Sequence, residues 1–435
     1  MASIIIIVGR PNVGKSTLFN RLSRTKTALV DNRPGITRDR LYASIHYNGV
    51  PFTLVDTGGF DELGHDPLLK KVQNQVKTAI AEADRVIFMV DGRQGVISGD
   101  KEVADILRRS QKEVFLAVNK IDGPEHDHLT HDFYSLGIKF VYPVSAAHGY
   151  GIKSFMPDVI KNLPEFKTEN EDPDQIRVAV LGKPNVGKSS LINRVLGSDR
   201  LLVSEIPGTT RDAVDTLFHY GGKEYLLIDT AGIRRKAKVK EKIEKFSVIK
   251  SLKSISRCHV AVILIDAWEG LSDQDVRICG YAVEQGKAVI LAVNKWDLVK
   301  GDARKRLDLD NEIDRRLKFI SFAPRINLSA LTGERTMKLF NKINLLYEQF
   351  SRRFSTPSIN KAIQKIITRH PPTRIGHGKL KFFYATQVRI RPPTFVIFVN
   401  RPEALHFSYE RFLVNQLRAY FQLDSCPIIL KFKKR

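Results

Sequence analysis

Short apolar runs rich in β-branched residues recur along the chain, and longer segments with helical spacing of apolar residues separate them. Such runs begin at Ile4 and Val86, and again at Val178 and Val260. Continuous apolar strands between amphipathic helices are typical of a mostly parallel sheet with helices on both faces. The pattern therefore predicts an α/β fold for residues up to about 350.

The pattern changes after residue 355. It predicts a helix over 358–368, strands over 379–388 and 394–400, a helix over 408–421 and a last strand over 427–432. We interpret this segment as a small α+β domain. Its phenylalanines fall at spacings typical of buried positions, so we expect them in the core: Phe382, Phe383, Phe395, Phe398 and Phe412.

The chain repeats itself at long range. GRPNVGKS, which starts at Gly9, aligns with GKPNVGKS, which starts at Gly182, and the same offset of 173 residues aligns PGITRD with PGTTRD and DTGG with DTAG. NKID from Asn119 aligns with NKWD from Asn294 at an offset of 175. Solenoid repeats are only about 20 to 50 residues long. The sequence therefore contains a duplicated domain.

Together these features divide the chain into four segments. We expect a first domain over 1–164, an acidic linker over 165–175, a second copy of the domain over 176–353 and the small domain over 354–435. The linker is acidic and contains little apolar surface, so it should be solvated. The length of 435 residues agrees, since about 150 residues per domain gives about three domains.

Composition places the protein inside the cell. The chain has no apolar run near the roughly 18 residues that span a bilayer, and its N-terminal apolar run is too short for a secretion signal. Three widely spaced cysteines, Cys258, Cys279 and Cys426, form neither a disulfide framework nor a metal-binding motif. We expect a cytoplasmic monomer with no role at a membrane.

The positive charge is concentrated at one end. The formal net charge is +23, and residues 351–435 supply +14 of it, with 17 Lys and Arg against 3 Asp and Glu. Such a domain favours binding to a polyanion through release of counterions. A nucleic-acid partner is indicated, although a basic domain without a partner would show the same charge.

Both copies contain a loop suited to phosphates. GxxxxGK[ST] after an apolar strand turns backbone N–H groups toward the positive end of the next helix, and its lysine adds a charge for the outer phosphates. Ser16 and Ser189 then offer a hydroxyl to Mg²⁺, and Asp56 and Asp229 end apolar strands where a carboxylate would hold that ion. In the loops before them, Thr37 and Thr210 are candidates to complete the metal site when a third phosphate is present.

The remaining repeated motifs predict the base. Asp122 and Asp297 each provide a carboxylate for the two neighbouring N–H donors of guanine, which adenine lacks. Backbone N–H groups near Ser145 and Ser329 could bind the base oxygen. We therefore expect GTP and GDP as ligands. The predicted nucleotide-site residues of the first copy are Gly9, Arg10, Pro11, Asn12, Val13, Gly14, Lys15, Ser16, Thr37, Asp56, Thr57, Gly58, Gly59, Phe60, Asn119, Lys120, Ile121, Asp122, Ser145 and Ala146. Those of the second copy are Gly182, Lys183, Pro184, Asn185, Val186, Gly187, Lys188, Ser189, Thr210, Asp229, Thr230, Ala231, Gly232, Ile233, Asn294, Lys295, Trp296, Asp297, Ser329 and Ala330.

These ordered duplicate motifs, with the C-terminal segment PPTFVIFVNRPEALHFSYERFLVNQLR, resemble the EngA (Der) family over essentially the whole chain. That family has two P-loop GTPase domains followed by a KH-like domain. The resemblance implies GTP hydrolysis coupled to assembly of the large ribosomal subunit in bacteria, with that subunit and its RNA as partners.

The sequence leaves the chemistry of hydrolysis open. Phe60 and Ile233 stand where many regulatory GTPases have a glutamine that orients water, so we assign no general base and only charge stabilisation to Lys15 and Lys188. Asn12 and Asn185 resemble the asparagine that helps related GTPases hold K⁺, but an asparagine here can also serve the turn alone.

The route of RNA binding is also open. The strip Arg234–Lys245 is strongly basic and follows the second DTAG, so the nucleotide could control its exposure. The small domain lacks a GxxG clamp between helices, because its nearest glycines, Gly376 and Gly378, precede a strand. We expect it to act mainly as a packing wedge, with basic residues touching phosphates at its rim: Lys379, Lys381, Arg389, Arg391 and the terminal KFKKR.

Two other functions compete with a two-site switch. One is a scaffold in which one site keeps its nucleotide without turnover. The other is a GTPase of tRNA modification, against which the chain offers no paired cysteines or cofactor domain.

Overall fold

A computed structural model of the chain describes residues 3–23, 42–57, 79–163, 175–197, 202–207, 214–230, 248–372 and 380–435. It divides into two compact units, Met1–Asn170 with Ser247–Lys250, and Glu171–Phe246 with Ser251–Arg435. We describe each unit by itself. Of the predicted linker, only Gln175 is described, and it is the first residue of a strand.

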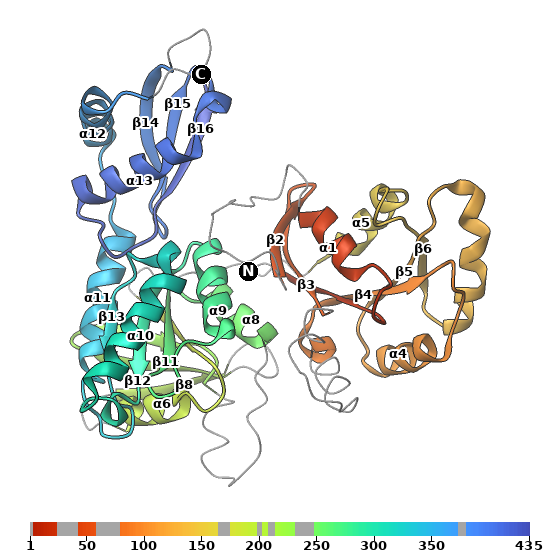
Figure 1. Ribbon diagram of the computed structural model, residues 1–435, viewed down its shortest axis with the longest axis horizontal. Coiled ribbons are helices and arrows are strands. Elements are labelled where there is room, and N and C mark those ends of the chain that lie inside the picture. Colours follow the sequence, from red (N-terminus) through yellow and green to blue (C-terminus); the bar gives the residue numbers. More distant parts are fainter. Residues whose placement is uncertain are drawn as a thin grey trace. The chain divides into compact units, whose positions relative to one another are not determined.

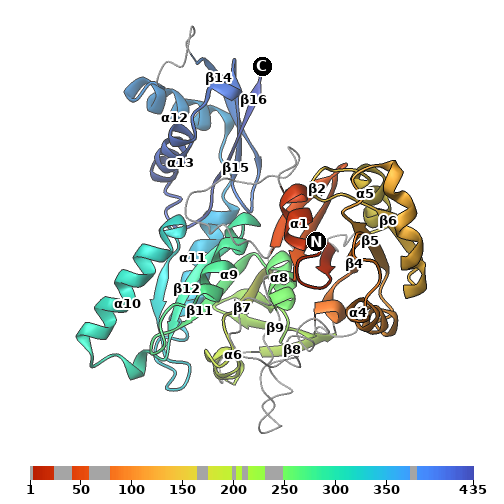
Figure 2. The ribbon, with the colours of Figure 1, turned by 45° about the vertical axis from the view of Figure 1, so that its right-hand side comes forward.

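The first unit is an α/β sheet in the order β2-β3-β1-β4-β5-β6 (Figures 1 and 2). Only β2 runs antiparallel to its neighbour. The strands are β1 (Ser3–Val8), β2 (Tyr42–Tyr47), β3 (Val50–Asp56), β4 (Arg85–Asp91), β5 (Val114–Asn119) and β6 (Phe140–Pro143). The helices are α1 (Lys15–Ser23), α4 (Ser98–Arg109), the 3-10 helix η1 (Pro124–Leu136) and α5 (Ile152–Ile160).

Helices cover both faces of this sheet, which is why its central strands are continuously apolar. Ile5 and Ile7 of β1 share a core with residues of α1 and α5. Because side chains alternate along a strand, Ile4 and Ile6 lie on the other face of the sheet. Helix α4 covers that face (Figure 1). All four side chains are at most 2% exposed. Burial on both sides confirms the α/β prediction and fixes the carboxyl ends of the parallel strands at one edge.

The second unit begins with a larger version of the same sheet, in the order β13-β12-β11-β7-β10-β9-β8. Its strands are β7 (Gln175–Leu181), β8 (Leu202–Pro207), β9 (Val214–Tyr220), β10 (Lys223–Leu227), β11 (Val260–Asp266), β12 (Ala288–Asn294) and β13 (Arg325–Asn327). Its helices are α6 (Lys188–Leu196), α8 (Val248–Arg257), α9 (Asp273–Glu284), the 3-10 helices η3 (Trp296–Leu298) and η4 (Lys318–Ile320), α10 (Ala303–Arg316) and α11 (Lys338–Ser351). The structure thus contains the predicted duplication, with β8 and β9 pairing antiparallel at one end of the sheet.

The C-terminal part of this unit is a three-stranded sheet in the order β14-β15-β16 with two helices. Its elements are α12 (Thr356–Arg369), β14 (Phe382–Arg389), β15 (Thr394–Val399), the 3-10 helix η5 (Pro402–Ala404), α13 (Phe407–Phe421) and β16 (Ile429–Lys434). The predicted order of elements is confirmed, with each boundary within about three residues of its expected place. One apolar cluster contains Ile176, Phe350, Ile359 and Leu430, so the second sheet and the C-terminal part share an interior.

One of the predicted core phenylalanines is not in the core. Phe395 is fully buried, and Phe382, Phe398 and Phe412 are partly buried. Phe383 is 41% exposed, and the guanidinium of Arg435 lies 4.9 Å from its ring centroid. The pairing of β14 with β15 shifts register between Phe382 and Tyr384, so strict alternation fails there and the burial prediction for Phe383 is wrong.

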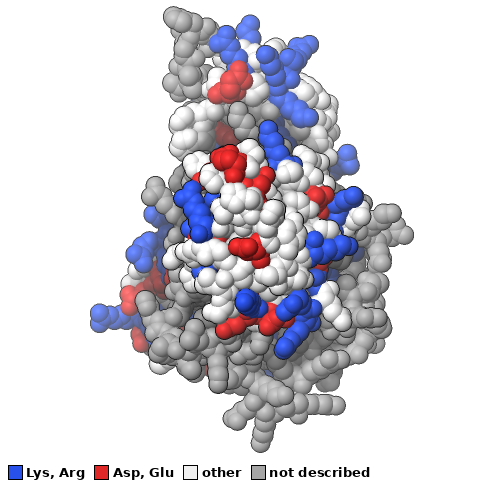
Figure 3. All heavy atoms as spheres, turned by 90° about the vertical axis from the view of Figure 1, so that its right-hand side faces the viewer, with Lys and Arg blue, Asp and Glu red and all other residues white. Residues whose placement is uncertain are grey.

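The basic residues of this domain divide into two groups. Lys381, Arg389 and the charged residues of the terminal KFKKR are exposed. Arg391 is partly buried: it donates to the Tyr347 hydroxyl at 2.6 Å and packs over that ring. On the face drawn in Figure 3, most of the charged residues on the upper part of the described surface are Lys and Arg, whereas both signs are mixed below it. Among the described residues, no helix is both long and apolar enough to span a membrane.

Candidate functional site

Each phosphate loop folds its lysine back onto its own backbone. Lys15 opens α1, is 4% exposed, and donates from Nζ to the carbonyls of Gly9 at 2.8 Å and Arg10 at 2.7 Å. Lys188 opens α6 and does the same to Gly182 at 3.0 Å and Lys183 at 2.7 Å. The ammonium therefore stays over the mouth of the loop, at the helix N-terminus, where an outer phosphate would meet it.

The asparagine of each NKxD motif ties two loops together. Asn119 donates from Nδ2 to the carbonyl of Val13 at 2.7 Å and accepts at Oδ1 from the amide of Ala146 at 2.8 Å. Asn294 bonds the Val186 carbonyl at 2.7 Å and the Ala330 amide at 2.9 Å. The structure thus brings the predicted phosphate loop, NKxD motif and Ser-Ala loop to the same edge of each sheet.

Two glycines are required by this contact. Gly14 has φ +101°, and a Cβ built there would lie 2.3 Å from Asn119 Nδ2. Gly187 has φ +100°, and its Cβ would lie 2.2 Å from Asn294 Nδ2. Only glycine permits both the left-handed backbone and the close approach.

The lysine of each NKxD motif reaches a buried aspartate at the end of the neighbouring strand. Lys120 Nζ lies 2.5 Å from Asp91 Oδ2, and Lys295 Nζ lies 2.6 Å from Asp266 Oδ2. Burial acts to raise the pKa of Asp266, but the bonds from Lys295 and from two backbone amides hold it below the ordinary value. Sequence reasoning missed both aspartates, although DGRQG and DAWEG follow their strands at the offset of the NKxD motifs.

The structure supports a metal site most directly in the first copy. Asp56 ends β3, is 4% exposed, and accepts from the Ser16 hydroxyl at 2.7 Å. In the second copy Asp229 follows β10, and its amide donates to Asp215 Oδ1 at 2.9 Å. A hydroxyl beside a carboxylate is a set of hard oxygen donors, and such donors fit Mg²⁺.

Other predicted residues lie on these loops with less specific surroundings. Asn12 and Asn185 are exposed and have left-handed backbones, with φ 66° and 60°. Thr57 donates to the Ile7 carbonyl at 2.7 Å, and Thr230 shares a hydrogen bond with Thr216 at 2.6 Å. Ile121 and Trp296 are buried beneath the NKxD turns.

Several predicted residues lie outside the described residues. They are Thr37, Gly58, Gly59, Phe60, Thr210, Ala231, Gly232 and Ile233, together with the basic strip Arg234–Lys245 and with Gly376, Gly378 and Lys379.

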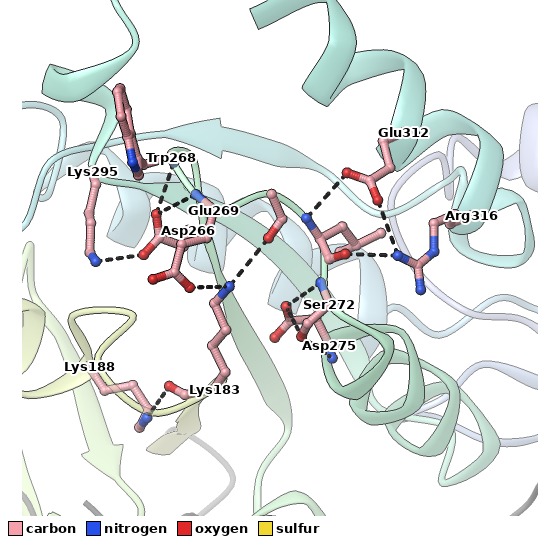
Figure 4. Close-up of polar contacts among 12 residues, drawn as sticks. Lys183, Lys188, Asp266, Trp268, Glu269, Ser272, Asp275, Lys295, Glu312 and Arg316 are labelled. Atoms are coloured by element: carbon pink, nitrogen blue, oxygen red, sulfur yellow. Dashed lines mark hydrogen bonds and ion pairs between the residues drawn. The ribbon is translucent and has the colours of Figure 1, made fainter. Parts of the chain in front are cut away.

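The second residue of each phosphate loop has a carboxylate partner that the sequence did not reveal. Arg10 Nε lies 2.7 Å from Asp100, which is fully buried at the start of α4. Lys183 Nζ lies 2.8 Å from Glu269 Oε2 (Figure 4). Figure 4 also shows the loop between β11 and α9 held by Arg316, which donates to the Leu271 carbonyl at 2.8 Å.

A pair of helix arginines was also missed. Arg21 of α1 donates to the carbonyls of Ala146 and Ala147, and Arg194 of α6 donates to that of Leu331. Each therefore supports the Ser-Ala loop of its own copy. The repeat could have identified them, because FNRL and INRV align at the same offset of 173.

Comparison with known proteins agrees with this arrangement. A family model described as "50S ribosome-binding GTPase" matches residues 4–120 and 177–295, and one described as "KH-domain-like of EngA bacterial GTPase enzymes, C-terminal" matches 353–433. GTPase Der of Syntrophobacter fumaroxidans is 47% identical over 100% of this chain and 98% of its own length. GTPase Der of Syntrophotalea carbinolica is 48% identical over 100% and 99%. Among solved structures, the G domain of the T. maritima FeoB iron transporter aligns at a TM-score of 0.27, with 26% identity over 39% of this chain and 98% of that one.

Two copies of the phosphate loop and NKxD arrangement on α/β sheets, followed by a KH-like domain, define a tandem P-loop GTPase. The enzyme class is thereby set, with GTP and GDP as its nucleotides. Because relatives close to half identical match over the full chain, this protein belongs to the GTPase Der (EngA) family.

Proposed function

We propose that this protein is a GTP-driven switch with two nucleotide sites that acts in assembly of the large ribosomal subunit. It does so in the cytoplasm, as a monomer, through nucleotide-dependent binding to ribosomal RNA. The observation that carries the proposal is the repeated link from NKxD asparagine to phosphate loop and Ser-Ala loop, on a chain that also has a strongly basic KH-like domain. The units of this function are the segments 1–164, 176–353 and 354–435.

In each site the chain's own residues would bind and orient the nucleotide. Lys15 and Lys188 place an ammonium at the outer phosphates, where charge builds up during phosphoryl transfer. Asp122 and Asp297 select guanine over adenine, because guanine presents two neighbouring N–H donors to the carboxylate and adenine presents no such pair.

Magnesium would be held by Ser16 and Asp56 in the first site and by Ser189 and Asp229 in the second, with Thr37 and Thr210 added in the triphosphate state. When bound, the ion neutralises charge on the terminal phosphates. The 2.7 Å contact of Ser16 with Asp56 supports this assignment, since the two oxygens already lie close enough to share one cation.

Hydrolysis in this proposal depends on charge rather than on a side-chain base. Asn12 and Asn185 stand on the open side of the phosphate loops and would hold K⁺ against the phosphates. Turnover measured in K⁺ should exceed turnover in Na⁺ at equal ionic strength. Equal rates would remove the potassium assignment while leaving the nucleotide sites intact.

The exposed lysines and arginines of the KH-like domain would contact RNA phosphates and position the protein without reading sequence. The strip Arg234–Lys245 would add a contact controlled by the second nucleotide. Changing Arg234, Arg235 and Lys236 to Glu should weaken ribosome binding and leave GDP affinity unchanged. Unaltered co-sedimentation with ribosomal subunits would contradict a role for the strip.

Two experiments test the proposal as a whole. Phosphate release is measured after Lys15→Ala and Lys188→Ala separately, and each change should abolish turnover at its own site. If only one change lowers turnover, the protein is closer to a scaffold with one structural nucleotide.

The second experiment sediments the chain with large subunits under GTP, GDP and a nonhydrolysable analogue. We expect binding to depend on the nucleotide. Equal binding in all three states would exclude the switch.

A further inference from the structure

The loops after β4 and β11 are equivalent in the two GTPase copies, yet they present different side chains. In each loop an aspartate accepts from the backbone amide two residues later, from Arg93 to Asp91 at 3.0 Å and from Trp268 to Asp266 at 2.9 Å. The same aspartates receive the NKxD lysines. Arg93 and Trp268 therefore occupy the same position, one with a cationic side chain and the other with an aromatic one.

In the first copy, Arg93 occupies the carboxylate assigned to guanine. Arg93 Nη2 lies 2.6 Å from Asp122 Oδ2, and the Ser145 hydroxyl donates to Asp122 Oδ1 at 2.7 Å. The hydrogen bond from Ser145, with the nearby charges of His148 and Arg93, holds the pKa of Asp122 below its ordinary value. Both carboxylate oxygens thus have partners within the chain, and a base that needs both must displace the guanidinium.

In the second copy, the equivalent side chain, Trp268, makes no ion pair with the carboxylate, because it is uncharged. Trp268 is 56% exposed, and Lys305 Nζ of α10 lies 3.0 Å from its ring centroid. Asp297 Oδ1 is buried, and the described part of the chain offers it no hydrogen-bond partner. Figure 4 shows the contacts of the Trp268 amide and of Lys295 with Asp266.

At Asp297, guanine has no cation of the described residues to displace, so its hydrogen bond to the carboxylate is an added interaction. At Asp122, the guanine donor only takes the place of the Arg93 guanidinium. The two carboxylates therefore differ in the free energy that they contribute to guanine binding.

We propose that Arg93 and Trp268 make the two guanine sites unequal: Arg93 is a latch on Asp122 that guanine must displace, whereas Trp268 forms no such ion pair with Asp297. This inference rests on the proposed guanine recognition by Asp122 and Asp297. It makes Arg93 an affinity-determining residue of the first site. The occupancy of that site then depends on ionic strength, because salt weakens the latch.

The size of the effect follows from the exposure of the ion pair. The side chains of Arg93 and Asp122 are 64% and 30% exposed. Such pairs change an equilibrium by about two- to fivefold. The latch therefore tunes the first site and does not close it.

The test isolates each site in the full-length chain. With Lys188→Ala silencing the second site, Arg93→Ala should tighten fluorescent GDP binding at the first site by about two- to fivefold, and about 0.5 M KCl should shrink the gain. ADP affinity should not change, because adenine does not use Asp122. With Lys15→Ala silencing the first site, Trp268→Arg should weaken GDP binding at the second site by a similar factor.

Arg108→Ala is the matched control, since Arg108 is an exposed arginine of α4 whose ion pair, within the part of the chain that the structure describes, is with its helix neighbour Asp105. It changes the net charge equally and should leave GDP affinity unaltered. GDP affinity that is unchanged or weaker in Arg93→Ala overturns the latch, even where GDP is clearly preferred to ADP. If the unaltered chain binds GDP and ADP equally, the guanine assignment itself fails, and the latch fails with it.

Discussion

Replacing Asn294 would show how strongly the nucleotide site depends on one buried amide. The side chain is 2% exposed and makes two hydrogen bonds, to the Val186 carbonyl and from the Ala330 amide. Asn294→Ala leaves both backbone groups unpaired in the interior. At about 1 to 3 kcal/mol for each unsatisfied group, the loop arrangement that binds the nucleotide is destabilised by about 2 to 6 kcal/mol. Since 1.4 kcal/mol is a factor of ten, GDP affinity at the second site should fall at least about 30-fold.

The assay is titration of fluorescent GDP into the Lys15→Ala chain with and without the change. Asn294→Asp is the sharper variant, because it keeps the acceptor for Ala330 but sets a carboxylate oxygen against the Val186 carbonyl. It should be nearly as damaging as alanine. Asn311→Ala, at an exposed position of α10, is the control and should leave affinity within about twofold. Wild-type affinity in Asn294→Asp would refute the reasoning.

Three further predictions use other features of the structure. Gly187→Ala places a Cβ 2.2 Å from Asn294 Nδ2 at φ +100°, so GDP binding at the second site should fall at least about tenfold, whereas Gly301→Ala, which meets nothing within 4 Å, should have no effect in the same titration. Burial, reinforced by the charges of Arg391, Lys287 and Arg177, lowers the pKa of His259 to about 3. The imidazole is then neutral in the folded state but takes up a proton in the unfolded state below about pH 6.5, so stability should fall with pH from 6.5 toward 3 by up to about 1.4 kcal/mol per pH unit. Urea unfolding at pH 7 and pH 5 should show this loss, and His259→Gln should reduce it; an equal loss in the variant would assign it to other groups. Burial raises the thiol pKa of all three cysteines, Cys258, Cys279 and Cys426. A thiol reagent should therefore label none of them in the native protein and all three in urea, and rapid labelling of the native protein would contradict their burial.

Sequence reasoning succeeded where local rules and the repeat determine structure. The apolar runs located the strands, because burial on both faces of a parallel sheet requires such runs. The aligned motifs placed Lys15, Lys188 and the NKxD asparagines at the carboxyl edges of those strands. No distance was needed for that conclusion, since strand order and loop position are enough.

Contacts between distant side chains escaped the same reasoning. The pair of Arg10 with Asp100 joins residues 90 positions apart, and the two become neighbours only when β1 and β4 lie side by side. The different contacts of Arg93 and its equivalent Trp268 could not be predicted either. The aligned loops after β4 and β11 share a backbone geometry, but that geometry does not determine what each side chain contacts.

The one wrong burial prediction in the C-terminal domain has a physical cause. Phe383 was assigned to the core because alternation was assumed through a register shift. A count of charges also does not reveal packing, so the bond from the Arg391 guanidinium to the Tyr347 hydroxyl of α11 was not foreseen. The charge count therefore predicted that the domain is basic, but not which of its Lys and Arg side chains are exposed.

Helix α11 packs against both the second GTPase domain and the KH-like domain. Its apolar face completes the core above β7 and β11, while near its end the Phe350 carbonyl accepts from the Arg391 amide at 3.1 Å and the Gln349 side chain accepts from the Ser425 amide at 3.1 Å. A swivel between the two domains would have to break these bonds and open the shared interior. A displacement of α11 should therefore move the basic surface of the KH-like domain with it.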